Sequence, residues 1–153
     1  MTLVLDIDTQ AQEVLRASEL LTLTRSFAQV FPVLNQKSYL IEVIFVSLTD
    51  MQKLNREQRS KDKPTDVLSF PLFQGQEDWE SFAIPTDISL GTIIICPEYA
   101  ADQGTPLLDL LHHGIVHILG FDHESDETQW RSIERAIVKS AADEGLIIHG
   151  IPD

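Results

Sequence analysis

Three histidines near the C-terminal end of the chain have the type and spacing of a metal site. His113 and His117 are four residues apart, so on an α-helix both rings lie on one face, one turn apart. Gly120 can end that helix in a left-handed conformation and turn the chain so that His123 faces the same point. Three imidazoles with a fourth position open to water are typical of catalytic zinc, whereas structural zinc sites are usually rich in cysteine, and Cys96 is the single cysteine here. The pattern predicts one Zn²⁺ bound by His113, His117 and His123; nickel and manganese are also compatible with histidine ligands, although zinc suits three imidazoles best.

Two neighbours of these histidines are assigned supporting positions. His112 lies about 100° around the helix from His113, so we expect it to back a ligand or to face solvent. Asp122 either orients a ligand histidine by accepting its second ring N–H or caps a turn.

The same spacing, His-x-x-x-His-x-x-Gly-x-x-His, also occurs in zinc peptidases of the metzincin type. In those enzymes a glutamate follows the first histidine and takes the proton of the water. Here Gly114 occupies that position, and neither Asp122 nor Glu124 lies on the helical face that could replace it. A zinc metallopeptidase is therefore kept as an alternative function.

A second segment concentrates positive charge in an acidic chain. The formal net charge is −13, with 11 lysines and arginines in all. Five of these fall within one window of eleven residues, where two acids leave a local charge of about +3 (five minus two). Because the planar fork of arginine matches phosphate oxygens, the window predicts a local phosphate contact; the alternative is a solvated turn between a helix and a strand. The basic residues are Lys53, Arg56, Arg59, Lys61 and Lys63.

The two segments together carry a family resemblance. The chain reads His-Gly-x-x-His-x-x-Gly-Phe-Asp-His at 113–123 and Arg-Ser-Lys-Asp-Lys-Pro-Thr-Asp-Val-Leu-Ser-Phe-Pro at 59–71. Both motifs and their separation resemble the YbeY family of bacterial metal-dependent endoribonucleases, over most of residues 40–145. The resemblance implies single-strand-specific RNA cleavage in rRNA maturation, especially at the 3′ end of the small-subunit rRNA, and a role in ribosome quality control. It implies His113, His117 and His123 as metal ligands and Arg59 as the essential catalytic residue.

The chain departs from this family pattern in two respects. Thr92 stands in Leu90-Gly91-Thr92-Ile93 where family members commonly have aspartate. The chain is also acidic, and a −13 protein repels RNA at long range. We therefore expect either a local, weak RNA contact or a basic partner that delivers the substrate, for which the proteins of the small ribosomal subunit are suited.

The expected chemistry combines the metal with Arg59. Zinc lowers the pKa of a bound water toward about 7 and stabilises charge on a phosphoryl oxygen. Arg59 is expected to hold the same phosphate with contacts that strengthen in the transition state. Water and the ribose 2′-hydroxyl both remain candidate nucleophiles. A third hypothesis is a non-catalytic ribosome-assembly factor in which the metal is structural.

Composition and periodicity predict an α+β fold in a single domain, residues 1–153: one small mixed β-sheet with helices packed on it, and the histidine site on a helix and the turn after it. Strands are expected at 2–7, 39–48, 66–70 and 89–96, and helices at about 10–30, 49–58, 105–119 and 126–144. The segment 73–87 is interpreted as a solvated loop. The absence of a leader or membrane segment predicts a cytoplasmic protein.

Overall fold

Four strands form one mixed sheet in the computed structural model, which describes residues 3–73, 88–120 and 127–149. They are β1 (Leu3–Ile7), β2 (Tyr39–Phe45), β3 (Val67–Pro71) and β4 (Ile88–Ile95), in the order β1-β2-β4-β3. The first three strands of that order run parallel, and β3 pairs antiparallel with β4 at one edge. The predicted α+β class is confirmed, and each predicted strand is present with its ends moved by at most three residues.

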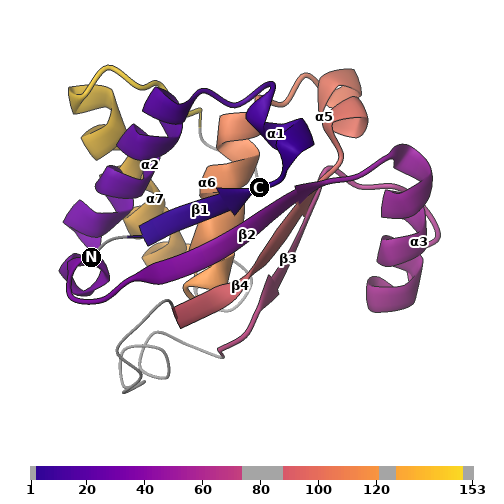
Figure 1. Ribbon diagram of the computed structural model, residues 1–153, viewed down its shortest axis with the longest axis horizontal. Helices are drawn as coiled ribbons and strands as arrows, with labels where there is room; N and C mark the ends of the chain where they lie inside the picture. Colours follow the sequence, from indigo (N-terminus) through magenta and orange to yellow (C-terminus); the bar gives the residue numbers. More distant parts are fainter. Residues whose placement is uncertain (1–2, 74–87, 121–126, 150–153) are drawn as a thin grey trace.

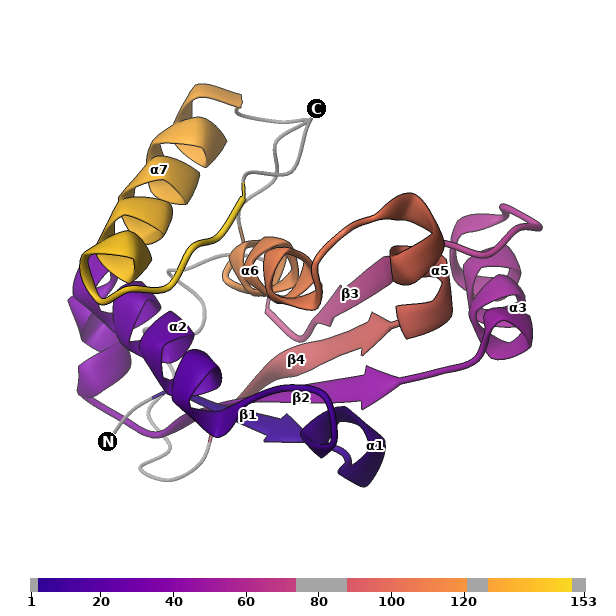
Figure 2. The same cartoon turned by 90° about the horizontal axis from the view of Figure 1, so that it is seen from above.

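Helices flank this sheet on both of its faces. In Figures 1 and 2, α2, α6 and α7 lie together against one face, while α3 stands beyond the ends of β2 and β4. None of the helices in the described ranges is both long and apolar enough to cross a membrane. The helices are α1 (Thr9–Gln12), α2 (Ala17–Val30), the 3-10 helix η1 (Pro32–Asn35), α3 (Leu48–Arg59), α5 (Pro97–Gln103), α6 (Leu107–Ile118) and α7 (Glu127–Asp143).

The expected helix over residues 10–30 is two helices, α1 and α2. Asp8 explains the break: one carboxylate oxygen accepts the N–H of Ala11 at 2.8 Å and so caps α1, while the other accepts the N–H of Phe45 at 3.1 Å. The first turn is thereby fixed to the end of β2. The chain must turn before α2 can pack back along the sheet.

The helix α5 is not predicted by the sequence pattern, although Pro97 at its first position is a recognised start signal.

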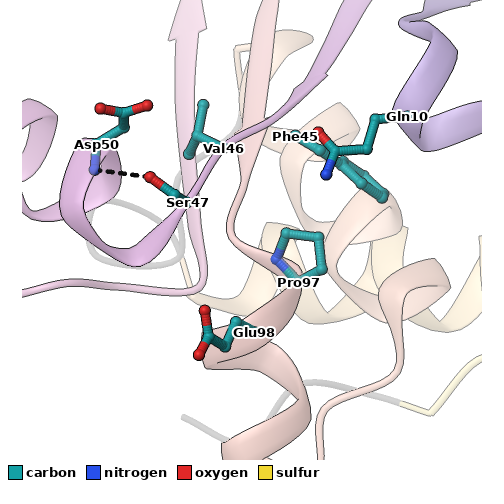
Figure 3. A pocket seen from close by; sticks show the side chains of 7 residues that line it. All are labelled: Gln10, Phe45, Val46, Ser47, Asp50, Pro97 and Glu98. Carbon is teal, nitrogen blue, oxygen red and sulfur yellow. Dashed lines mark hydrogen bonds between the residues drawn. The ribbon is translucent and has the colours of Figure 1, made fainter.

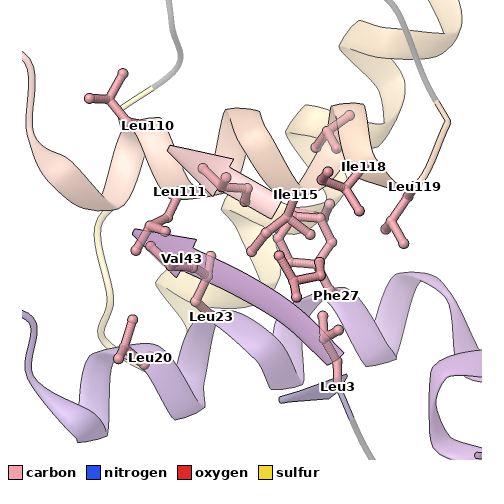
Figure 4. Close-up of a cluster of buried hydrophobic side chains, with 14 of the residues drawn as sticks. Leu3, Leu20, Leu23, Phe27, Val43, Leu110, Leu111, Ile115, Ile118 and Leu119 are labelled. Carbon is pink, nitrogen blue, oxygen red and sulfur yellow. The ribbon is translucent and has the colours of Figure 1, made fainter. Parts of the chain in front are cut away.

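The main core lies between the sheet and the helices α2, α6 and α7. Figure 4 shows Leu23 and Phe27 of α2 facing Ile115 of α6 across the cluster. These residues are fully buried, as is Val43 beneath them. The spacing of apolar residues predicts a core-facing stripe on the last helix, formed by Trp130, Ile133, Ile137 and Val138. On α7, Trp130 and Ile137 are buried, and the other two pack partly buried against the core, which confirms the stripe. Burial of such side chains is the main source of stability for α6, and so for the element that carries His113 and His117.

A smaller cluster joins α3 to the opposite face of the sheet. Met51 of α3 packs with Leu68 of β3 and with Cys96, and Ile94 of β4 lies against them. The next residue back along β4, Ile93, contacts Gly114 of α6. Because successive side chains of a strand point to opposite faces, α3 and α6 pack on opposite faces of β3 and β4.

The helix predicted over residues 105–119 is confirmed as α6. The sequence predicts Thr105 as its N-cap, Pro106 as its first residue and Asp109 in its first turns, and the cap prediction is wrong. Pro106, rather than Thr105, occupies the N-cap position. The N–H of Thr105 instead donates to the carbonyl of Ala100 at 2.9 Å, which closes the preceding helix α5. Asp109 lies in the first turn as expected, yet it is buried, with 3 % of its surface exposed. Its Oδ1 accepts the N–H of His149 at 3.0 Å and so fixes the C-terminal segment to α6.

Replacing Asp109 with asparagine should make the protein less sensitive to rising pH. Burial raises the pKa of Asp109 above its ordinary value, partly opposed by the hydrogen bond from His149. The folded state therefore binds the proton more tightly than the unfolded state, and stability falls as pH rises through the interval between the two pKa values. Asparagine keeps the acceptor without the charge. We expect the stability of Asp109→Asn relative to the native protein to increase from acid to neutral pH in urea denaturation.

The matched control for that change is Asp143→Asn, which removes an exposed carboxylate near the end of α7. It measures the effect of removing a carboxylate that is not buried. A pH dependence for Asp109→Asn no larger than that of Asp143→Asn would show that burial of Asp109 does not alter its protonation.

Candidate metal centre

His113 and His117 converge on one point, as the i, i+4 spacing predicts. Their Nε2 atoms are 3.1 Å apart and their ring centroids 4.6 Å apart, with the planes nearly perpendicular. Without a metal, one ring can donate its N–H to the other at this distance. Two zinc–nitrogen bonds of about 2.0–2.1 Å at a tetrahedral angle would separate the nitrogens by about 3.3–3.4 Å. The pair therefore fits two positions of a zinc coordination shell with little adjustment.

The helix ends where the sequence predicts that it should. Leu119 is the C-cap of α6, and Gly120 has a φ of +100°, in the left-handed region. Within the described ranges, no further histidine, cysteine, aspartate or glutamate joins the pair to form a group of three. His123, the third predicted ligand, lies outside the described residues, and so do Asp122 and Glu124. The loop expected over 73–87 also lies outside them from residue 74 on.

Trp130 of α7 forms a wall against both histidine rings. Its ring centroid is 5.1 Å from that of His113 and 4.9 Å from that of His117. The indole is almost fully buried, with 4 % of its surface exposed. The sequence predicts this residue only as part of the apolar core stripe of the last helix. Spacing gives no signal for the contact, because it depends on how α7 packs across α6.

Gly114 brings α6 against the sheet. A Cβ atom at this position would lie 2.9 Å from Cδ1 and 3.0 Å from Cγ2 of Ile93, closer than such atoms pack. The residue after the first histidine thus faces β4 and is fully enclosed. A glutamate here would start from a Cβ that points at β4, and it would have to displace the side chain of Ile93. The packing gives a physical reason for the missing peptidase base.

His112 faces the core, so the expectation that it backs a ligand or faces solvent is wrong. Only 1 % of its surface is exposed, and its ring lies 5.9 Å from that of Phe27. Neither ring nitrogen has a hydrogen-bond partner in the part of the chain that the structure describes. Burial lowers the pKa of His112 from 6.5 to about 4, which keeps the imidazole neutral at physiological pH. The angle of about 100° between His112 and His113 around the helix predicted that the two side chains lie on different faces of α6. It did not predict that α2 covers the face that carries His112.

Arg59 ends α3, and the loop that follows is folded back onto that helix. Asn55 is buried and its Nδ2 donates to the carbonyl of Lys63 at 2.8 Å. Gln52 donates to Asp62 at 3.1 Å, and Arg56 pairs with the same carboxylate at 3.4 Å. These contacts give the basic segment a defined shape. We call it the basic arm; its exposed cations are Lys53, Arg56, Arg59, Lys61 and Lys63.

The structure brings His113 and His117 together but does not bring Arg59 to them within the described residues. In both Figure 1 and Figure 2, β3 lies between α3 and α6. The two helices pack on opposite faces of β3 and β4, as the contacts of Ile94 and Ile93 establish. The basic arm and the histidine pair therefore lie on the two sides of an edge strand.

Thr92 lies on the face of the sheet away from the histidines. Its Oγ1 donates to Oε1 of Glu42, its register partner on β2, at 3.4 Å. Ile93, the next residue, is the one that packs on α6. The departure from the family pattern at Thr92 therefore leaves the contacts of the histidine pair unchanged.

A pocket of about 500 Å³ lies where β2 and β4 end, and Figure 3 shows its walls. The polar groups there include Ser47, which caps α3 by accepting the N–H of Asp50 at 3.2 Å. Asp50 and Glu98 each lie in the first turn of a helix, where negative charge is favoured by the helix dipole. None of the residues predicted as site residues lines this pocket. Its lining residues are Gln10, Phe45, Val46, Ser47, Asp50, Pro97 and Glu98.

Comparison with known proteins gives consistent matches. The family model described as Endoribonuclease YbeY matches residues 6–142. A protein of Sulfurovum sp. (strain NBC37-1) named endoribonuclease YbeY is 40% identical over 107 residues, which covers 65% of this chain and 70% of the relative. A Finegoldia magna protein of the same name is 40% identical over 116 residues, covering 69% and 71%. The solution structure of TM1509 from Thermotoga maritima has a similar fold, with a TM-score of 0.52 at 24% identity over 92% of this chain and 91% of that chain.

Proposed function

Because this chain belongs to the YbeY family of endoribonucleases, we propose that it is a metal-dependent enzyme that cleaves single-stranded RNA during the maturation and quality control of ribosomal RNA. Family membership makes the chain an RNA-cleaving hydrolase of rRNA processing. The observation that carries the metal dependence is the convergence of the His113 and His117 Nε2 atoms, 3.1 Å apart on a buried, rigid helix.

His113, His117 and His123 would hold one Zn²⁺, because three imidazoles are the donor set that catalytic zinc prefers. When bound, zinc supplies a Lewis acid that lowers the pKa of a water molecule and offsets charge on a phosphoryl oxygen. The protein's own contribution is to hold the imidazoles in place. Gly114 seats α6 directly on Ile93, and Trp130 closes one side of the pair against water. Both contacts fix the two rings before substrate arrives.

The basic arm would bind the RNA backbone. Its five cations are exposed, and Arg59 makes no ion pair within the described residues. Since the arm and the histidine pair lie on two sides of β3, we propose that a single strand passes over this edge, with Arg59 on one of its phosphates. A single strand bends around such an edge, whereas a stiff duplex does not. This arrangement supports a preference for single-stranded substrate.

Arg59→Ala should reduce RNA cleavage by about 10- to 100-fold, because a lost charge-assisted phosphate contact typically contributes about 1.5–3 kcal/mol. The zinc content should stay unchanged, since Arg59 ends α3, which packs on the opposite face of β3 and β4 from the helix that carries the histidines. The slope of log affinity against log salt concentration should fall by about 1. Cleavage rates, metal analysis and RNA binding at several salt concentrations measure these three effects.

The control for Arg59 is Arg25→Ala, which removes an exposed arginine from α2, on the opposite side of the molecule. It should cleave RNA like the native protein. Equal cleavage by both variants would remove Arg59 from substrate binding.

The proposed function is tested by cleavage of one RNA in two forms, single-stranded and annealed to its complement. The purified protein should cut the single strand in the presence of zinc, stop cutting after a chelator removes the metal, and resume when zinc is restored. It should cut the duplex poorly. Absence of zinc-dependent cleavage, together with binding to the small ribosomal subunit, would favour the assembly-factor hypothesis instead. Zinc-dependent proteolysis without RNA cleavage would favour the metallopeptidase, against which the enclosed Gly114 argues.

The acidity of the chain supports a basic partner. At −13, the protein repels free RNA except near the basic arm. We propose that the small ribosomal subunit or its basic proteins present the rRNA to the enzyme, which places its action in the cytoplasm. The expected result is that cleavage of rRNA within the subunit tolerates higher salt than cleavage of the same free RNA.

A further inference from the structure

We propose that Trp130 is a positioning residue for the metal centre: it sets the orientation of both imidazoles and thereby the affinity for the metal. This inference rests on the proposed function, because it takes His113 and His117 as ligands. Its basis is the three-ring cluster, in which each ring contacts the other two, with centroid separations of 4.6, 4.9 and 5.1 Å.

The cluster restricts the rotation of the two imidazoles. The indole plane is inclined by 66° to the ring of His113 and by 50° to that of His117. Tilted and edge-on contacts at such separations are the favoured geometries of aromatic pairs. A rotation of either imidazole about its side-chain bonds would press it into the indole or open a gap beside it. Trp130 is itself buried in the main core, so it cannot move aside.

Trp130 also joins two helices of the core. It lies in the first turn of α7, which begins at Glu127, and its ring contacts those of His113 and His117 on α6, which ends at Ile118. The indole therefore fixes α7 against the histidine face of α6.

The test compares three variants of the full chain by zinc titration calorimetry and by the visible spectrum of the Co²⁺-substituted protein. Trp130→Leu keeps an apolar side chain but removes the aromatic ring. Trp130→Phe keeps an aromatic ring. Phe27→Leu is the matched control, because Phe27 is a fully buried aromatic residue of the same core that contacts His112 rather than the pair.

We expect Trp130→Leu to weaken zinc binding about 10-fold or more, the scale known for groups that orient metal ligands, and to change the Co²⁺ spectrum. Trp130→Phe should recover most of the affinity and the native spectrum. Phe27→Leu should lose stability but bind zinc like the native protein. Native affinity in Trp130→Leu, or an equal loss of affinity in Phe27→Leu, would overturn the inference while leaving the metal site intact. Failure of the native protein itself to bind zinc would overturn the metal site, and this inference with it.

Discussion

Replacing His117 with alanine will abolish both zinc binding and RNA cleavage while the protein stays folded. His117 supplies one of the two converging nitrogens. Loss of a group that only orients a metal ligand typically lowers metal affinity or activity by about 10–100-fold, and loss of a ligand itself should have a larger effect. We therefore expect zinc affinity and cleavage rate to decrease by more than about 100-fold. Alanine is the best helix former, and His117 is only half-buried near the end of α6, so the helix should persist. Cleavage rate, zinc content and circular dichroism measure the three outcomes.

The control is His149→Ala, prepared in the same way to exclude a contaminating nuclease. His149 is exposed, and its contact with Asp109 uses the backbone N–H, which alanine retains. This variant should cleave RNA at the native rate. If His117→Ala and His149→Ala cut equally well, the activity does not come from the histidine pair.

Gly91→Ala should cost about 3 kcal/mol or more of unfolding free energy, the largest stability effect that we predict. Gly91 has a φ of +149°, and a Cβ there would lie 2.4 Å from the carbonyl oxygen of Phe70, 2.8 Å from Cδ1 of Ile118 and 3.0 Å from Cα of Pro71. Strained backbone and overpacking each contribute about 1–3 kcal/mol. The Phe70 oxygen belongs to the β3 backbone and cannot retreat without disturbing the pairing with β4. Urea denaturation measures the loss.

Alanine variants of two other glycines measure the cost of backbone strain without steric overlap. Gly104 and Gly145 have φ values of +68° and +88°, and a Cβ at either would meet nothing within 4 Å. Their alanine variants should lose only about 1 kcal/mol, the strain term alone. A loss in Gly91→Ala no larger than in these two would mean that β3 and the end of α6 adjust freely, contrary to the close approach described above.

The elements that carry the site were predictable because local signals and tertiary packing agree there. The strands β2 and β4 are runs of β-branched and aromatic residues, and the i, i+4 spacing of His113 and His117 fixes their shared face without any knowledge of the fold. The helix predicted over 10–30 is present but divided into α1 and α2, because Asp8 binds Phe45, a contact 37 residues away that no local pattern reveals.

The surroundings of the site were less predictable because they depend on packing between elements. Helical geometry separated His112 from His113 but could not show that α2 would bury it against Phe27. Trp130 was predicted as core, and it is core, yet its contact with both histidines follows only from the docking of α7 on α6. The family resemblance joined Arg59 to the histidines in one mechanism, whereas the fold puts β3 between their helices.

The three-ring cluster also makes the native protein its own optical probe. Indole emission is quenched by contact with paramagnetic ions and is altered by charge on an adjacent ring, and here the fluorophore touches both candidate ligands. The chain has two tryptophans, Trp79 and Trp130, so a Trp79→Phe background leaves a single emitter at the histidine pair. Occupancy of the site in the purified protein can then be followed in real time without any attached dye.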